Sequence, residues 1–106
     1  MKYKVKASLL KDKMPAFYKV LTNGTVQKQN PDGAEIVSSM KRSKITGPEI
    51  IEWYETCYCP SPLRHERETV FDQYLANIET QLVETIEDIE GESFWLYLVR
   101  AAEGAN

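Results

Sequence analysis

The stretch from Ile50 to Ile78 constrains the fold more than any other part of the chain. It begins with a run of branched and aromatic residues, Ile50 to Cys59, which is typical of a β-strand. Pro60 has no N–H to give to a neighbouring strand, so the strand is expected to end there. Apolar residues then return at helical spacing, which predicts a helix directly after the strand. They are Leu63, Val70, Phe71, Tyr74 and Ile78.

Side chains of a β-strand alternate between its two faces, so this strand has one face for the core and one for the outside. The face interpreted as the inner one carries Ile51, Trp53, Glu55, Cys57 and Cys59. The outer face carries Tyr54 and Tyr58. In the helix that follows, Ser61 is expected to be the N-cap and Pro62 the first helical residue.

One charged residue, Arg67, falls in the middle of the apolar stripe when the helix is drawn at about 100° per residue. A buried arginine needs a carboxylate, because an unpaired buried charge is very costly. Glu55 lies on the inner face of the strand, so the sequence predicts a half-buried Glu55–Arg67 ion pair. The alternative is that Arg67 extends its charged end outward over the edge of the sheet.

The N-terminal part of the chain predicts a strand and a helix. Residues 2–10 alternate strictly between apolar and mostly basic side chains, as a half-buried strand does. Asp12 is expected to cap a helix that ends at Asn23-Gly24. Residues 34–45 suit either a helix or a strand. A strand is preferred, because the turn at 46–49 would then join it to the central strand as a hairpin.

The C-terminal part predicts one more strand and one more helix. Residues 78–86 alternate between apolar and polar side chains and are interpreted as a strand. Residues 93–102 are apolar nearly all round, which favours a helix that buries more than one face. The element order then matches the ferredoxin-like, split-βαβ pattern (βαββαβ) with an extra C-terminal helix. We therefore predict one α+β domain over residues 1–106 with a four-stranded antiparallel sheet.

Charge is distributed unevenly along the chain. Residues 1–44 hold ten Lys and Arg against three acids, whereas residues 45–106 hold three Arg against thirteen acids. Such a split can indicate a nucleic-acid-binding face. In a ferredoxin-like layout, however, the fourth strand lies beside the first. The N-terminal lysines would then lie beside Glu79, where opposite charges stabilise strand pairing.

Cys57, Cys59 and His65 form the first candidate site. Thiolates and an imidazole can hold zinc or another thiophilic metal, and an activated thiol can act in redox chemistry. Familiar structural zinc sites, however, have two residues between the cysteines and a second pair elsewhere. The simpler interpretation is that both cysteines fill the inner face as small apolar residues, so no metal or other cofactor is expected.

Glu55, Arg67, Arg64 and Trp53 form the second candidate site. An arginine above a partly covered sheet can clamp a small carboxylate or phosphate with two hydrogen bonds. This cluster therefore predicts a small anionic ligand. The alternative is an ordinary core that contains one structural ion pair.

Partners and location follow from what the sequence lacks. No apolar run approaches the roughly 20 residues of a membrane span, and the first residues do not resemble a signal peptide. Two cysteines one residue apart on one strand face are poorly placed for a mutual disulfide. These features predict a reduced, cytoplasmic protein without membrane contact. The basic segment 38–44 lacks the signature of RNA-binding sheets, so nucleic acid is not the expected partner.

The chain matches no catalytic motif, and the predicted fold hosts many unrelated functions. The leading hypothesis is a homodimeric module that binds a ligand or a partner. A second copy or the last helix would cover an open sheet face that carries Tyr54, Tyr58 and Val83. One alternative is a small enzyme that uses one of the two candidate sites. Another is a single-stranded nucleic-acid binder.

Overall fold

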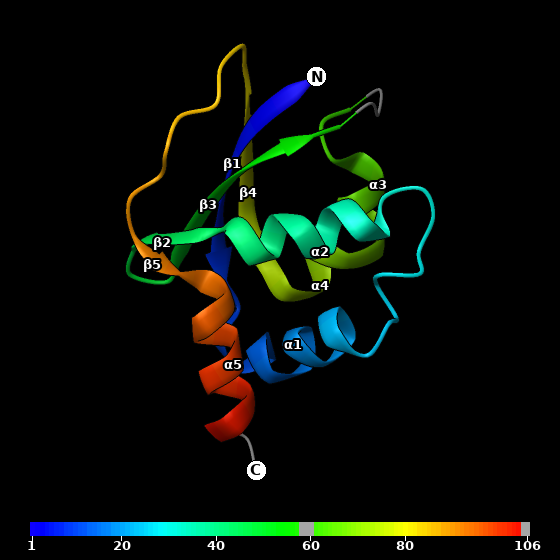
Figure 1. The fold of residues 1–106 in the computed structure, drawn as a ribbon, viewed down its shortest axis with the longest axis vertical. Coiled ribbons are helices and arrows are strands. Elements are labelled where there is room, and N and C mark those ends of the chain that lie inside the picture. The colour runs from blue at the N-terminus through cyan, green and yellow to red at the C-terminus, as the bar shows by residue number, and fades with distance from the viewer. Residues whose placement is uncertain (58–60, 105–106) are drawn as a thin grey trace.

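The structure, a computed structural model, describes residues 1–57 and 61–104 of the chain. These residues form an α+β fold in which α1 (Met14–Thr22) and α2 (Gly33–Arg42) lie in front of an antiparallel sheet (Figure 1). The sheet has five strands in the order β4-β1-β3-β2-β5. Their bounds are β1 Lys2–Leu9, β2 Lys44–Gly47, β3 Ile50–Thr56, β4 Leu75–Val83 and β5 Glu92–Ser93. The predicted sheet of four strands is therefore one strand too small.

The predicted alternation of β1 is confirmed. Its odd-numbered residues point into the core, where Val5 and Ala7 are almost fully buried, whereas Lys2 and Lys6 on the other face are exposed. On that outer face Lys6 lies directly opposite Glu79 of β4. The Nζ atom of Lys4 is 3.7 Å from a carboxylate oxygen of Glu52. Basic and acidic strands thus lie side by side, as predicted from the charge distribution.

Residues 34–45 do not form the predicted strand. Gly33–Arg42 is the helix α2, and only Lys44–Gly47 joins the sheet, as β2. The helix buries Ile36, Val37 and Met40 against the sheet. These residues recur at helical spacing, which favours the helix. The predicted hairpin with the central strand does form, but its first strand is only the four residues of β2.

The central strand has the predicted inner face. Ile51, Trp53, Glu55 and Cys57 are all buried, whereas Cys59 lies outside the described residues. The helical segment that follows is α3 (Arg64–Glu66), the wider π-helical turn η2 (Arg67–Phe71) and α4 (Asp72–Tyr74).

The predicted start of this helical segment is wrong. The first helical residue is Arg64 rather than Pro62, because Leu63 adopts a left-handed backbone conformation with φ of 57° and ends the turn. Ser61 is not the N-cap either. Its carbonyl oxygen accepts a 3.1 Å hydrogen bond from the N–H of Arg64. The segment therefore begins later along the chain than its sequence suggests.

The first helix also begins differently from the expectation. Asp12 lies inside the short turn η1 (Lys11–Lys13), and α1 starts at Met14 without a side-chain cap. The predicted capping role of Asp12 is therefore wrong. Phe17 and Leu21 on α1 are buried and contribute to the core.

The predicted C-terminal helix is confirmed as α5 (Phe94–Gly104). It packs against α1 and α2 and buries Phe94 and Leu98. Leu96 on its outer side is 55% exposed, whereas Trp95, Tyr97 and Ala101 also pack against the core. The helix also leaves the outer sheet face uncovered, since it joins the helical layer (Figure 1).

Residues 84–91 connect the two edges of the sheet. β4 forms one edge and β5 the other, so this segment must pass across the end of the strands between them (Figure 1). No helix among the described residues is long and apolar enough to cross a membrane.

Candidate functional site

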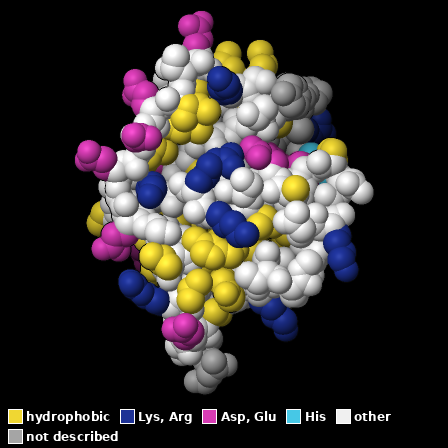
Figure 2. Space-filling model, in the orientation of Figure 1, with side chains coloured by type: hydrophobic (Ala, Val, Ile, Leu, Met, Phe, Trp, Pro, Cys, Tyr) yellow, Lys and Arg dark blue, Asp and Glu magenta, His cyan; other side chains and the backbone are white. Residues whose placement is uncertain are grey.

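A surface hollow of about 370 Å³ lies where β2 stops short of the end of β3. Residues of β3 form one part of its lining, and residues 86–89 of the connection between the sheet edges form another. Figure 2 shows acidic side chains following that connection along one side of the molecule. The lining residues are Arg42, Lys44, Trp53, Tyr54, Glu55, Thr56, Ile86, Glu87, Asp88 and Ile89.

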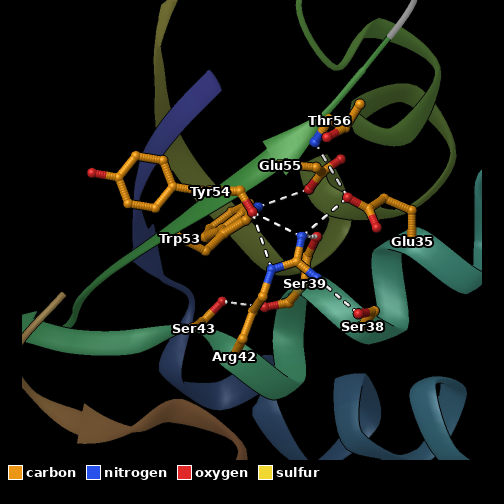
Figure 3. Close-up of polar contacts among 9 residues, drawn as sticks. All are labelled: Glu35, Ser38, Ser39, Arg42, Ser43, Trp53, Tyr54, Glu55 and Thr56. Atoms are coloured by element: carbon orange, nitrogen blue, oxygen red, sulfur yellow. Dashed lines mark hydrogen bonds and ion pairs between the residues drawn. The ribbon is translucent and has the colours of Figure 1, made fainter. Parts of the chain in front are cut away.

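Arg42, the last residue of α2, takes the place of a neighbouring strand beside β3. Beyond Glu52, which is opposite Lys44, β3 has no strand on this side. The Nη2 and Nε atoms of Arg42 donate to the carbonyl oxygen of Tyr54 at 2.8 and 3.2 Å (Figure 3). The guanidinium group thus satisfies a backbone acceptor that a longer β2 would have paired.

Glu35 provides the complementary contact. Its Oε2 accepts a 3.2 Å hydrogen bond from the N–H of Thr56 and lies 3.0 Å from Nη2 of Arg42 (Figure 3). Ser38 and Ser39 on the same helix accept further bonds from this guanidinium group. Every nitrogen of Arg42 is therefore engaged within the protein, and this arginine holds the wall of the hollow in place.

Trp53 and Glu55 form the inner wall of the hollow. Both are on the inner face of β3, and the ring of Trp53 packs at a tilt against Phe71. The indole Nε1–H of Trp53 donates a 2.7 Å hydrogen bond to Oε1 of Glu55 (Figure 3). Glu55 is only 2% exposed, so its carboxyl group is held in a largely desolvated position beside the hollow.

The partner of Glu55 is Glu66 on α3, rather than an arginine. Glu66 is 1% exposed, and the two carboxyl groups share a side-chain hydrogen bond. One oxygen of each, Oε2, meets no other donor among the described residues. Two carboxylates can only accept hydrogen bonds, so one of these groups must carry a proton in order to donate to the other.

The pKa values identify which carboxyl group keeps the proton. Burial, together with the hydrogen bond to Glu55, raises the pKa of Glu66 to about 11. The charges of Asp32 and Cys57 act in the same direction. Burial also raises the pKa of Glu55, although the hydrogen bonds that its carboxylate accepts oppose this effect. At neutral pH Glu66 is therefore the proton donor of the pair.

The predicted Glu55–Arg67 ion pair is wrong. The side chain of Arg67 is 41% exposed, and its Nε lies 3.4 Å from Oδ1 of Asp72. Arg64 is exposed as well and pairs with Glu68 at 3.1 Å. Of the second candidate site, the structure brings Glu55 and Trp53 together at the hollow and leaves both arginines at the surface.

The first candidate site is also divided. His65 Nδ1 lies 2.7 Å from Oδ2 of Asp32, the residue that precedes α2. Cys57 is buried at the end of β3, and Cys59 lies outside the described residues. Within residues 1–57 and 61–104, no three His, Cys, Asp or Glu side chains come together in a group that could hold a metal ion.

Sequence reasoning missed Glu66 and Arg42, although both left a signal. Glu66 follows Leu63 by three residues and precedes Val70 by four, which is the spacing of one helix face. Glu35 and Arg42 are seven residues apart, which also places them on one face once the segment is helical.

Comparison of the chain with known protein families, with curated proteins and with solved structures gave no match. The function must therefore be argued from the geometry of the hollow and its carboxyl pair.

Proposed function

We propose that this protein is a binding module for a small organic amine, which occupies the hollow beside Glu55. The observation that carries the proposal is the position of Glu55, which is one of the lining residues of the hollow and whose carboxyl group is buried. When Glu55 is ionised and Glu66 keeps its proton, the pair carries one negative charge. No described cation contacts that pair, and a positively charged nitrogen from outside would compensate the charge.

The remaining lining supports the same class of ligand. Tyr54, Ile86 and Ile89 offer apolar contact, and Glu87 and Asp88 add negative charge at the rim. The guanidinium group of Arg42 is already bonded to Glu35, to serine hydroxyls and to the backbone, so its charge is largely compensated within the protein. A small anion at Arg64 and Arg67 has less support, because both pair with carboxylates at the surface.

The scaffold of the proposal is a ferredoxin-like core with an added fifth strand. The strand order β4-β1-β3-β2 supports this layout, and β5 extends it at one edge. The cytoplasm stays the proposed location. Nucleic-acid binding has less support, since the outward lysines of β1 lie beside Glu52 and Glu79.

A small enzyme that transfers a proton to or from the bound amine is the second candidate. It is favoured by one observation, the carboxyl pair with a single proton beside a hollow. Strongly shifted pKa values at a cleft are typical of acid–base sites. In this case the ligand would carry a carbonyl group beside the reacting carbon atom. Glu55 would accept the proton of that carbon, the electron pair would move onto the carbonyl oxygen as an enolate, and Glu66 would hold the pair's other proton. Exchange of ligand C–H hydrogen in D₂O, followed by NMR, would detect this reaction.

The binding proposal is tested by NMR titration with a series of primary amines, using alcohols of the same carbon skeleton as the comparison. The indole N–H of Trp53 donates to Glu55, so its resonance reports directly on that carboxylate. Trp95, the other tryptophan, lies on α5 and serves as an internal reference. We expect amines to shift the Trp53 resonance and the corresponding alcohols to leave it unchanged.

Two variants complete the test. Glu55→Gln removes the charge and keeps the shape, so amine binding should be lost. Glu79→Gln removes one charge from the outer face of β4, and binding should be retained in this matched control. Equal responses to amines and alcohols, or unchanged binding by Glu55→Gln, would contradict the proposal.

A further inference from the structure

β4 is the one long sheet edge that the described part of the chain leaves unpaired. The opposite edge is β5, which has only two residues. The free end of β3 is closed by Arg42 and Glu35. β4 has nine residues, so it is not short like β5, and no described side chains bond to its free backbone groups as Arg42 and Glu35 do at β3. Natural proteins rarely leave such a row of backbone donors and acceptors open, because it is a template for pairing with another strand.

Hydrogen bonds at the two ends of β1 show which backbone groups of β4 point outward. The N–H of Cys57 donates to the carbonyl of Met1, and the N–H of Leu10 donates to the carbonyl of Tyr74. Odd-numbered residues of β1 therefore face β3, and even-numbered residues face β4. Lys6, Lys4 and Lys2 lie opposite Glu79, Gln81 and Val83, so these three β4 residues bond to β1.

The intervening residues of β4, Ile78, Thr80 and Leu82, must then point their N–H and C=O groups away from the sheet. β4 lies at the edge of the sheet, so no other strand of the described residues pairs with these groups. The side chains of the same residues lie on the face that carries Tyr3 and Val5, the face of the core. Leu82 is nevertheless 57% exposed, since the edge leaves it uncovered.

We propose that a second copy of this chain pairs with this edge, with β4 running antiparallel to the partner's β4 and Thr80 on the two-fold axis. Thr80 then faces the partner's Thr80, and Ile78 faces the partner's Leu82. Each of these residue pairs exchanges both of its N–H···O bonds, as outward-facing residues of antiparallel strands do. The interface is isologous, which is the commonest arrangement in homodimers.

Side chains favour this register. On the core face, Leu82 covers the partner's Ile78, which removes apolar surface of both residues from water. On the outer face, Glu79 lies opposite the partner's Gln81, so no glutamate faces its own copy. A two-fold axis at Ile78 would instead pair Thr80 with Ala76, next to the bulge of β4 that lies opposite Lys6 to Ser8. The axis at Thr80 places Thr80 and Leu82 in the regular part of the strand and leaves only Ile78 at the bulge.

The proposed dimer is independent of the hollow and its ligand. It predicts a concentration-dependent association in solution. Sedimentation equilibrium at up to about 1 mM protein would detect a dimer with a Kd as weak as about 1 mM. We expect a mass that rises toward twice the 12.2 kDa of one chain. Thr80→Pro removes only an outward N–H, and a proline is tolerated at such an edge position, so this variant should stay monomeric. Thr80→Val, which keeps the N–H, should dimerise as the unmodified chain does.

A charge exchange tests the register. Thr80→Lys and Thr80→Glu each place like charges opposite one another on the axis, so each alone should be monomeric. An equimolar mixture of the two should form a heterodimer, because lysine then faces glutamate. An unmodified chain that stays at 12.2 kDa at every concentration would overturn the proposal. Dimerisation of a folded Thr80→Pro variant, or no association in the mixture, would overturn it as well.

Discussion

Glu55 and Glu66 bury their carboxyl groups against each other, and Glu66 keeps the proton that lets both groups stay there. The two residues come from different elements, β3 and α3, so the pair joins the sheet to the helical layer. A proton is therefore a structural component of the core, and the stability of the fold depends on pH.

The first prediction is that the free energy of unfolding falls as the pH rises above about 5. Glu66 has an ordinary pKa of 4.5 when unfolded and about 11 when folded. Between these values the folded chain holds a proton that the unfolded chain has lost. Its stabilising effect is complete below 4.5 and is lost as the pH rises toward 11. One proton corresponds to a slope of about 1.4 kcal/mol per pH unit, which urea denaturation between pH 5 and 8 would measure.

Glu66→Gln should flatten this slope, since the amide donates to Glu55 without titrating. Glu68→Gln is the matched control, because Glu68 lies two residues further on and pairs with Arg64 at the surface. Its slope should equal that of the unmodified chain. Stability that increases over the same pH range would contradict the shared proton.

The second prediction compares two neighbouring residues. Glu66→Ala leaves the carboxyl group of Glu55 without its buried donor and should destabilise the fold by about 1–3 kcal/mol. Arg67→Ala removes an exposed side chain and should change stability by less than about 0.5 kcal/mol. Chemical denaturation at pH 7 measures both. A larger loss of stability for Arg67→Ala than for Glu66→Ala would instead support a Glu55–Arg67 pair.

The third prediction concerns the end of β3. Arg42→Met removes both donors to the carbonyl of Tyr54 and should cost about 1–3 kcal/mol. Hydrogen exchange at the N–H of Thr56 should also become faster, because Glu35 loses the cation that positions it. Arg42→Lys should recover only part of the loss, since an ammonium group lacks the planar fork.

Arg100→Met is the control for this clamp, because Arg100 is an exposed arginine on α5. It should leave both the free energy of unfolding and the exchange rate of Thr56 unchanged. A faster exchange in this control would mean that loss of any surface arginine has the same effect.

The fourth prediction uses two glycines. A β-carbon at Gly33, the first residue of α2, would clash with the backbone carbonyl oxygen of Val26. Gly33→Ala should therefore destabilise the fold by about 1–3 kcal/mol. Gly104 has no atom within 4 Å of such a carbon, so Gly104→Ala should stay within about 0.5 kcal/mol. Thermal and urea denaturation check both, and equal effects would rule out this close approach.

Local pattern predicted the elements that alternate cleanly. β1 and the inner face of β3 are predictable because nearly every second residue is apolar, Glu55 being the exception, and burial then decides the face. The hairpin at 46–49 is confirmed, but the residues before it form a helix, which the apolar spacing of Ile36, Val37 and Met40 indicates.

The site required information that the pattern does not contain. Placing Arg67 on the buried stripe assumed one regular helix from Ser61, whereas the helix begins at Arg64 and widens into a π-helical turn. In a π-helical turn each residue is rotated about the helix axis by less than 100° from the one before. A projection at 100° per residue therefore places Arg67 on the buried face, whereas the structure has its neighbour Glu66 there. That two glutamates meet is a tertiary contact between β3 and α3, which no local pattern could predict.

The central position of β1 affects how the chain is made. β1 precedes both of its neighbours in the chain, and its partners begin only at Ile50 and Leu75. During synthesis β1 therefore stays unpaired until the residues of β3 and β4 have been made. Lysines at every second position of the waiting strand repel other copies of it. We therefore expect the lysines that later face Glu52 and Glu79 to reduce aggregation of the nascent chain.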